Sequence, residues 1–470
     1  MTRKHVTIRA RTAAGKIVRR THVFWMTRFG PVLASASMPW SRQYAYALAD
    51  ANQANDRVLQ QWLEIARSRD VHELKAALER RLGLPWVNTI AADRDGNAFY
   101  ANLSVAPNFD AATLRGCAIA APGGLGNFFA VVDGSRTACA ATVDPAAAHP
   151  GLLPAQARPS MVRTDFVANS NGSHWLTNAA APLEGFSPVI GPERSAQSLR
   201  TRQNQIQVSE RLAGTDGLPG KRMSQEALER ILFSGRSLQA ELVLDDLLGA
   251  CTRAVATGDD AAERGRLQRG CGALSKWNRR YDLDSVGAHV FTEFVNQARQ
   301  PGSEDLGTTA GVWRIAFDPA DPVHTPRALD TDNPALLKAL GDAVARLDEA
   351  KIPLEARLGD VQFVVRDNVR IPLHGGATFS ALHATLVPGI GYTDPIGASN
   401  SYIQVVTFDA AGPVADAILA SSQTPEAGSA FHADQTLAYS RKQWLRLPFT
   451  PKAIAAAAIG PTRILRVPAR

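Results

Sequence analysis

One stretch, from Asp165 to Ile206, constrains the fold and function of this chain more than any other. Its residues include asparagines, a histidine, a tryptophan and arginines, among them Asn169, Asn171, Asn178, His174, Trp175, Arg200 and Arg202. Asparagine and serine side chains bond to their own backbone and favour turns, so the segment VANSNGSHW is predicted to be a strand end that breaks into a polar loop. The following residues, Ser195 to Val208, are predicted to form a helix that carries the arginines.

Two interpretations of this stretch follow from its residues. A loop amide near a helical arginine suits a site where negative charge develops, because fixed donors stabilise an oxyanion. An Asx turn followed by a solvated basic helix is the more common outcome for such residues. The residues alone leave both interpretations open.

Further segments extend the pattern over almost the whole chain. Besides ANSNGSHWLTN and SLRTRQNQI in the central stretch, they are TRFGPVLAS at Thr27 to Ser35, LPWVNTIAADRDGNAFYANLS at Leu84 to Ser104, IPLHGG at Ile371 to Gly376 and FHADQTLAYSRKQWLRLPFT at Phe431 to Thr450. In content and order this set resembles the penicillin amidase family, and within it the acylases of acyl-homoserine lactones and aculeacin.

The resemblance implies an α+β fold, the four-layer αββα sandwich of the N-terminal nucleophile hydrolases, incomplete and interrupted by a helical insertion. It predicts three parts. Residues 1–194 would form a partial core with an acyl pocket and the oxyanion loop, residues 195–347 a mainly helical insertion, and residues 348–470 a returning β-rich part of the core.

In this family a serine at the start of the large chain attacks an amide carbonyl, with its own α-amine as the base. The opening residues MTRKHVTIRARTAAGKIV resemble a point inside that large chain, so we expect the nucleophile to lie in a missing or separately encoded upstream segment. Thr2 would become N-terminal if Met1 were removed. However, Arg3, Lys4 and His5 do not resemble the residues after the family's serine, so we do not expect Thr2 to be catalytic.

Three residues are matched to family functions. Asn171, the second asparagine of the NSN pattern, matches the asparagine that stabilises the oxyanion. Arg202 matches the arginine that orients it, with Arg200 as the competing alignment. Trp86 is matched to the acyl-binding pocket, where a flat side chain can line a tunnel for a fatty tail; an ordinary buried tryptophan is the alternative.

The resemblance thus predicts an amide hydrolase that cleaves a linear acyl amide, such as a long-chain N-acyl-homoserine lactone, when the nucleophile segment is supplied. The alternatives are a noncatalytic acyl-binding module and an inactive truncated remnant. We expect no cofactor, no nucleic-acid partner and no membrane span. The metal prediction is also negative, because His374 and His383 lack partners at ligand spacing. His432 and Asp434 are predicted to be structural.

Four cysteines fall into two local pairs, Cys117 with Cys139 and Cys251 with Cys271. Neither pair has the Cys-x-x-Cys spacing of a metal or redox site. Two disulfides are predicted, and they would imply an oxidising compartment; four unpaired buried thiols are the alternative. Family members are commonly exported to the periplasm or secreted, whereas the sequence as it stands has no apolar signal segment and would remain in the cytoplasm.

Composition and charge indicate an ordinary globular protein, with 45% hydrophobic and 20% charged residues among 470. The net charge is +7, but 51 Lys and Arg are spread among 44 Asp and Glu and the basic runs are short. This distribution favours a solvated surface over nucleic-acid binding.

Local patterns predict several elements. Strands are expected from Val6 to Ser35, a segment that belongs to the layered sheet core in the family. An amphipathic helix is expected from Asp50 to Arg67, with Trp62 in its buried stripe. Asp70 should cap a second helix, and Leu84 to Ser104 should form a hairpin. Serines, an asparagine and a proline mark further helix starts at Ser224, Ser237 and Asn333-Pro334, and strands return after Gly359.

Overall fold

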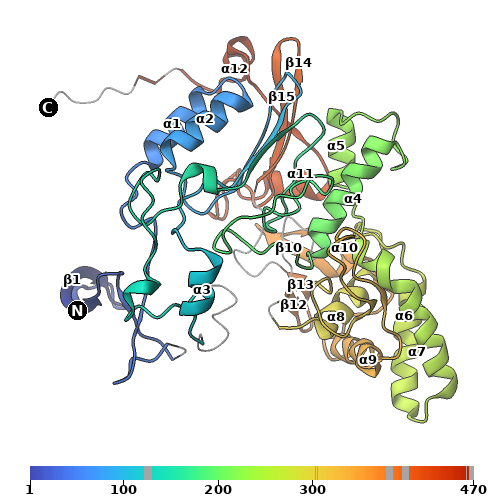
Figure 1. Cartoon of the computed structure of the whole chain (residues 1–470). Coiled ribbons are helices and arrows are strands. Elements are labelled where there is room, and N and C mark those ends of the chain that lie inside the picture. Colours follow the sequence, from blue (N-terminus) through green and yellow to red (C-terminus); the bar gives the residue numbers. More distant parts are fainter. Residues whose placement is uncertain are drawn as a thin grey trace. The chain divides into compact units, whose positions relative to one another are not determined.

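The computed structural model describes residues 1–36, 38–120, 130–301, 303, 305–376, 385–393, 402–461 and 463–464. Helices and strands occur mostly in separate runs along the chain, as in the α+β class (Figure 1). The chain divides into two compact units, Met1–Glu193 and Arg194–Arg470. Among the described residues, no helix is both long enough and apolar enough to cross a membrane.

A long antiparallel hairpin opens the first unit. Its strands β1 (Thr2–Arg11) and β2 (Ile17–Met26) pair along their whole length. Gly15 has a φ of 79° in the connecting turn, a conformation that glycine adopts at little cost. A second small sheet contains β3 (Val32–Leu33) and β4 (Tyr46–Ala47). The predicted strands are confirmed, but within the described chain β1 and β2 form a sheet of their own and do not join a layered core.

The core of the first unit lies between a helix and a three-stranded antiparallel sheet. The sheet order is β5 (Thr89–Ala92), β6 (Ala98–Ala101), β7 (Ser160–Arg163), and the turn between β5 and β6 confirms the predicted hairpin. Helix α2 (Val71–Arg81) contributes buried leucines to the same cluster. Asp70 caps this helix, as predicted, by accepting two backbone N–H groups of its first turn.

Helix α1 (Val58–Arg67) differs from the prediction at its start and in its buried face. It begins eight residues after Asp50, whose side chain accepts a backbone hydrogen bond and starts a turn instead. The buried residue is Gln61, which donates to the carbonyl of Ala77 in α2. Trp62 is 55% exposed, so its prediction as a core residue was wrong.

The connection between β6 and β7 is mostly irregular in its described part. It contains α3 (Ala111–Cys117) and two short 3-10 turns, η2 (Thr137–Cys139) and η3 (Ala155–Ala157). A disulfide joins the last residues of α3 and η2, Cys117 and Cys139. This pairing confirms the first predicted disulfide.

Helices dominate the first part of the second unit. They are α4 (Leu199–Ala213), α5 (Gln225–Leu232), α6 (Leu238–Thr257), α7 (Ala261–Ser275), α8 (Ala288–Ala298) and α9 (Pro334–Glu349). Ser224, Ser237 and Asn333 cap α5, α6 and α9, as predicted. The second predicted disulfide, between Cys251 and Cys271, joins α6 to α7. Helices α6 to α9 share one large hydrophobic cluster and are called the helical body below.

Three sheets, two of them with three or more strands, and three short helices complete the described part of the second unit. One sheet has the order β11 (Val369–Pro372), β10 (Gln362–Arg366), β13 (Gly391–Thr393), β12 (Thr385–Val387). The other has the order β14 (Tyr402–Asp409), β15 (Gly412–Leu419), β16 (Leu445–Leu447). The remaining elements are β8 (Trp313–Ile315), β9 (Arg327–Leu329), α10 (Leu358–Val361), α11 (Asp434–Ser440) and α12 (Pro451–Ala457). The predicted return to strands is confirmed, whereas the three-part domain division stays a prediction.

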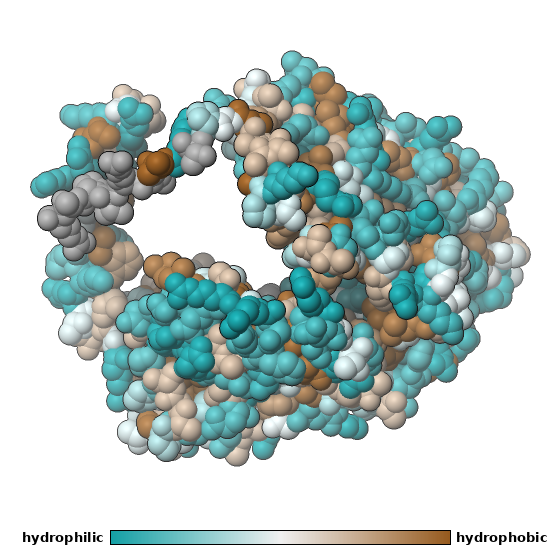
Figure 2. Space-filling view, turned by 90° about the horizontal axis from the view of Figure 1, so that it is seen from above, coloured by the Kyte–Doolittle hydropathy of each residue, from teal (hydrophilic) through white to brown (hydrophobic). Residues whose placement is uncertain are grey.

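On the face of the molecule seen in Figure 2, hydrophobic residues are scattered among hydrophilic ones. Large exposed hydrophobic side chains occur in both units. Singly scattered apolar side chains are normal on a protein surface. They do not by themselves mark a binding site.

Candidate functional site

The polar loop after β7 is held at both ends by Asp165 and its neighbours. Arg163 donates two hydrogen bonds to the Asp165 carboxylate, at 2.5 and 2.7 Å, and the backbone N–H of Phe166 donates another. These donors, Arg163 foremost, hold the pKa of Asp165 far below its usual value. Asn178, at the far end of the loop, donates to the carbonyl of Phe166. The loop is therefore closed at its base.

Asn169 shapes the turn that presents Asn171. The Asn169 Oδ1 atom accepts the backbone N–H of Asn171 at 3.0 Å, and its Nδ2 atom donates to the carbonyl of Gly172 at 3.2 Å. Asn171 has a φ of 63°, in the left-handed region that asparagine tolerates better than most residues. Asn171 is exposed. The predicted Asx turn is thus present, with Asn169 bonded within it and Asn171 at its surface.

A buried histidine and a glutamate support this turn from beneath. His174 is 1% exposed, and its Nε2 atom lies 3.0 Å from Oε1 of Glu193. The Glu193 carboxylate also accepts the backbone N–H groups of Gly185 and Phe186, each at 2.9 Å. Partial burial opposes ionisation of Glu193, but these donors outweigh it, so its pKa lies below the usual value. The contact between His174 and Glu193 therefore holds the turn and the C-terminal end of the segment 165–193 against each other.

Arg202 is buried in the second unit and holds two backbone carbonyls. It is 1% exposed; its Nε atom donates to the carbonyl of Val323 at 2.8 Å and its Nη1 atom to that of Pro326 at 2.9 Å. Its Nη2 atom has no hydrogen-bond partner among the described residues. Burial lowers the pKa of Arg202 to about 10, which leaves the guanidinium charged at neutral pH. The competing candidate, Arg200, is half-buried.

The helix that carries Arg202 starts later than predicted. Helix α4 begins at Leu199, not at Ser195, because Ser198 is its N-cap and accepts the N–H of Thr201. Arg202 therefore lies in the first turn of the helix, which fixes where its long side chain can reach.

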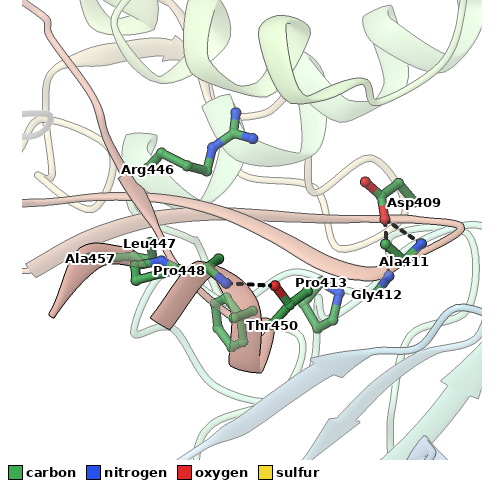
Figure 3. Close-up of a pocket in the computed structure, with 11 residues that line it drawn as sticks. Asp409, Ala411, Gly412, Pro413, Arg446, Leu447, Pro448, Thr450 and Ala457 are labelled. Atoms are coloured by element: carbon green, nitrogen blue, oxygen red, sulfur yellow. Dashed lines mark hydrogen bonds between the residues drawn. The ribbon is translucent and has the colours of Figure 1, made fainter. Parts of the chain in front are cut away.

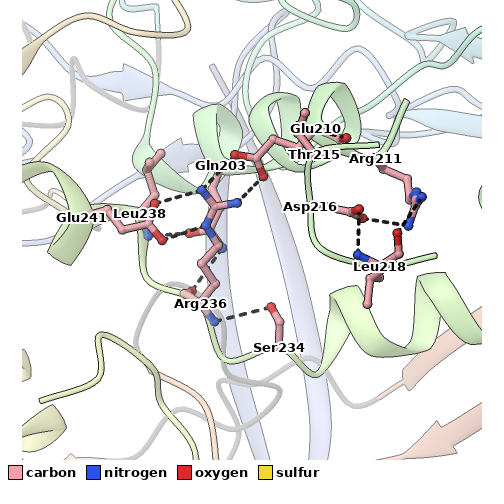
Figure 4. A network of polar contacts seen from close by, with 10 residues as sticks. All are labelled: Gln203, Glu210, Arg211, Thr215, Asp216, Leu218, Ser234, Arg236, Leu238 and Glu241. Atoms are coloured by element: carbon pink, nitrogen blue, oxygen red, sulfur yellow. Dashed lines mark hydrogen bonds and ion pairs between the residues drawn. The ribbon is translucent and has the colours of Figure 1, made fainter. Parts of the chain in front are cut away.

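Ion pairs fix the rest of α4 (Figure 4). Arg236 pairs with both Glu210 on α4 and Glu241 on α6, and these carboxylates, Glu241 foremost, raise the pKa of Arg236 above its usual value. The buried Arg211 pairs with Asp216 at 3.0 Å, which holds the turn after the helix. Helix α4 is thus a rigid element, as a support for a functional side chain must be.

The predicted site residues are divided between the two units. Asn171 belongs to the first unit and Arg202 to the second, so separate networks position them. Trp86 is 76% exposed with a φ of 48°, so the alternative of an ordinary buried tryptophan is wrong. Thr2 is an exposed residue at the start of the β1–β2 hairpin.

Of the two histidines considered as metal ligands, His374 lies within the described residues. His374 is buried, and its Nε2 atom lies 2.8 Å from the carbonyl of Tyr439; burial lowers the pKa of His374 to about 4. His383 lies outside the described residues. His432 lies 3.0 Å from the carboxylate of Asp367. In the described ranges, no group of three His, Cys, Asp or Glu side chains could hold a metal ion.

A pocket of about 280 Å³ lies in the second unit, between the turn after β14 and helix α12 (Figure 3). Its lining residues are Asp409, Ala411, Gly412, Pro413, Arg446, Leu447, Pro448, Phe449, Thr450, Ala453 and Ala457. The Asp409 carboxylate accepts two N–H groups of its own turn, and Thr450 caps α12. These polar groups serve local structure, and none of the predicted site residues lines this pocket.

Sequence reasoning identified Asn171 and His174 but missed Glu193. The segment SHW was noted as part of the central stretch, whereas the carboxylate that bonds His174 lies nineteen residues further along the chain. No local pattern connects two residues at that separation, so only the folded loop reveals the pair.

Comparison with known proteins places these features in a family. A family model described as penicillin amidase matches residues 1–456. Aculeacin-A acylase from Actinoplanes utahensis is 40% identical over 461 residues, which are 96% of this chain and 56% of that protein. The acyl-homoserine lactone acylase PvdQ from Pseudomonas syringae pv. syringae is 37% identical over 464 residues, 97% of this chain and 57% of that protein. The chain therefore spans little more than half the length of these relatives.

A solved structure supports the fold. The thermostable penicillin G acylase from Alcaligenes faecalis matches 100% of this chain and 82% of its own chain, with a TM-score of 0.54 and 16% identity. At this identity the likeness shows the fold alone. The predicted α+β fold of the N-terminal nucleophile hydrolases is thereby confirmed.

Proposed function

The chain belongs to the penicillin amidase family, and from this we propose that it is the part of an acylase that binds a linear acyl amide and stabilises the oxyanion formed during hydrolysis. The observation that carries the proposal is the turn at Asn171, an exposed asparagine on a loop that is held by the Asn169 side chain and by the His174–Glu193 contact. The names of the relatives suggest the substrate class, an acyl chain joined by an amide to a polar amine, such as a long-chain N-acyl-homoserine lactone.

In the proposed reaction a serine hydroxyl attacks the amide carbonyl carbon, the hydroxyl proton passes to the serine α-amine, and the carbonyl oxygen becomes negative. The side-chain Nδ2–H group of Asn171 donates a hydrogen bond to this oxyanion. The C–N bond of the intermediate then breaks as the leaving amine takes up the proton from the α-amine. The acyl-enzyme that remains is hydrolysed by water to the free acid and the free serine. Because the Asn171 backbone is already held by Asn169, little ordering is needed when the charge develops.

Arg202 is proposed to orient the asparagine electrostatically, with Arg200 as the alternative. Arg202 is buried and charged and has one unpartnered nitrogen among the described residues, so its charge is only partly compensated. Such a fixed cation favours nearby negative charge because the surrounding dielectric constant is low. Trp86 is proposed to cover the acyl tail, since a large exposed indole can close over an apolar chain.

The serine is proposed to come from a further segment, encoded separately or upstream. The relatives are far longer than the part of them that this chain matches. The two disulfides favour an oxidising compartment, which we propose to be the periplasm or the exterior of the cell, with the cytoplasm as the alternative for the chain made alone.

The direct test measures release of homoserine lactone by mass spectrometry. The chain is incubated with a long-chain N-acyl-homoserine lactone, alone and together with the part of aculeacin-A acylase that the chain does not match. We expect product only in the mixture. In that mixture, Asn171→Ala should lower kcat by about 10²- to 10³-fold with a small change in KM, because an oxyanion donor acts in the transition state.

Asn296→Ala is the matched control, since Asn296 is an exposed asparagine on α8. It should leave kcat unchanged. If the chain binds the lactone saturably but homoserine lactone is released in neither incubation, the acyl-binding module would be favoured instead. A kcat for Asn171→Ala equal to that of the parent would rule out the oxyanion role.

A further inference from the structure

The first 49 residues carry all of the net positive charge of the chain. They contain nine Lys and Arg and no Asp or Glu, whereas the rest of the chain contains 42 Lys and Arg and 44 Asp and Glu, a net charge of −2. Seven of the nine basic residues lie in the β1–β2 hairpin and its turn. The even mixing of positively and negatively charged residues that was predicted for the whole sequence therefore holds only after residue 49.

These basic side chains are not neutralised within the described structure. None of the nine makes an ion pair with a described residue. Arg9 lies directly opposite Arg19 in the ladder. Like charges in directly opposed positions destabilise a strand pair. The hairpin thus retains a repulsion that a bound carboxylate would relieve.

The outer edge of β1 is also open. Thr12 donates its N–H to the carbonyl of Lys16 across the turn, so by alternation the odd-numbered residues of β1 point their N–H and C=O groups away from β2. In the described chain no strand pairs with this edge. At the end of β2, by contrast, Trp25 packs against Trp40, with the two ring centroids 5.6 Å apart. A long open edge is a template for strand addition.

We propose that the outer edge of β1 binds an extended acidic segment of a polypeptide, which adds to the hairpin as a third strand. Such a strand uses main-chain hydrogen bonds for affinity and projects alternate side chains onto both faces of the sheet. The basic residues are distributed in the same way. Arg9 and Arg19 lie on one face, and Lys4 and Arg20 on the other.

Two other occupants fit these observations less well. A membrane surface favours an element with one apolar and one charged face. Here Ile8 lies opposite Arg20 on one face and Ile17 opposite Arg11 on the other, so both faces are mixed. A second copy of the chain would bring another cationic hairpin to the edge, and like charges disfavour that contact.

The test uses fluorescence anisotropy with a labelled peptide of alternating glutamate and valine, about ten residues long to match one strand. We expect saturable binding that weakens as salt is added. The same peptide with lysine in place of glutamate should not bind. Vesicles of phosphatidylcholine and phosphatidylserine form the second arm, and binding to vesicles but not to the acidic peptide would overturn the proposal.

Charge reversal tests the electrostatic part. The double variant Arg9→Glu, Arg19→Glu should weaken peptide binding by about tenfold or more. Arg67→Glu, a change of an exposed arginine on α1, is the control and should have no effect. Equal affinity of all three proteins would overturn the proposal.

A pair of proline variants tests the edge itself. His5 and Val23 face each other across the ladder, and each points its backbone N–H outward, His5 at the β1 edge and Val23 at the β2 edge. Proline is tolerated where the N–H faces solvent but removes a donor needed by an added strand. His5→Pro should abolish binding and Val23→Pro should retain it, with circular dichroism confirming the fold of both. Equal behaviour of the two variants would overturn the assignment to the β1 edge.

Discussion

The β1–β2 hairpin and the helical body illustrate two different relations between sequence pattern and burial. Both contain apolar side chains at regular spacing, and both form the elements that this spacing predicts. In the helical body these side chains make a large core in which Phe291 and Phe294 are inaccessible to solvent. In the hairpin, Ile8 and Phe24 are 56% and 41% exposed. A local pattern thus determines the type of element, whereas its burial depends on what the rest of the fold places against it.

The largest expected difference between these regions is in the cost of removing a phenylalanine. Phe291→Ala removes a ring whose centroid lies 4.8 Å from that of Trp277 and 5.8 Å from that of Phe294. It should lower the free energy of unfolding by about 3–5 kcal/mol, since a buried cavity remains. Phe24→Ala should change it by less than about 0.5 kcal/mol. Urea unfolding monitored by circular dichroism measures both.

This pair of variants also tests the state of the hairpin. A cost for Phe24→Ala close to that for Phe291→Ala would mean that another surface covers the hairpin in solution. The comparison between an exposed and a buried region would then no longer hold.

The same relation explains which parts of the fold could be predicted. Caps such as Ser224 and Ser237 were correct because a cap depends on a few adjacent residues. Trp62 was wrong because helical spacing defines a stripe but does not say which part of it a neighbouring element covers. For the same reason the isolated state of the hairpin could not be predicted from its alternating residues.

The candidate site divides in the same manner. Asn171 was found because a turn is encoded locally, and the structure adds that Asn169 holds it. The partners of Arg202, the carbonyls of Val323 and Pro326, lie more than a hundred residues away and leave no mark in the local sequence. Glu193 was missed for the same reason. The sequence is therefore a better guide to the candidate functional residues than to the distant residues that hold them in place.

A buried histidine in the helical body makes the stability of the protein depend on pH. His289 on α8 is 1% exposed, its Nε2 atom bonds the carbonyl of Pro353, and burial lowers its pKa to about 4. The unfolded chain, with a histidine pKa of about 6.5, binds the proton more readily. The contribution of His289 to the free energy of unfolding is thus fully present above pH ~6.5. It falls by roughly 3 kcal/mol in total as the pH is lowered towards ~4.

Urea unfolding between pH 7 and pH 4 tests this dependence. The parent protein should lose stability over the interval, and His289→Gln should show a smaller loss because it does not titrate. His374, with its pKa also lowered to about 4, would contribute part of the slope that remains. Parallel curves for the parent and His289→Gln would contradict the assignment.

The smallest predicted effects distinguish two faces of one helix. Gly270 and Gly272 both lie in α7. A Cβ atom at Gly270 would come within 2.8 Å of Val344 on α9, whereas one at Gly272 would meet nothing within 4 Å. Gly270→Ala should therefore destabilise by about 1–3 kcal/mol through overpacking. Gly272→Ala should stabilise by up to ~1 kcal/mol, because alanine has the higher helix propensity. Thermal unfolding of the two variants measures both effects, and shifts of the same sign would show that α7 and α9 are less closely packed than the contact of Gly270 with Val344 implies.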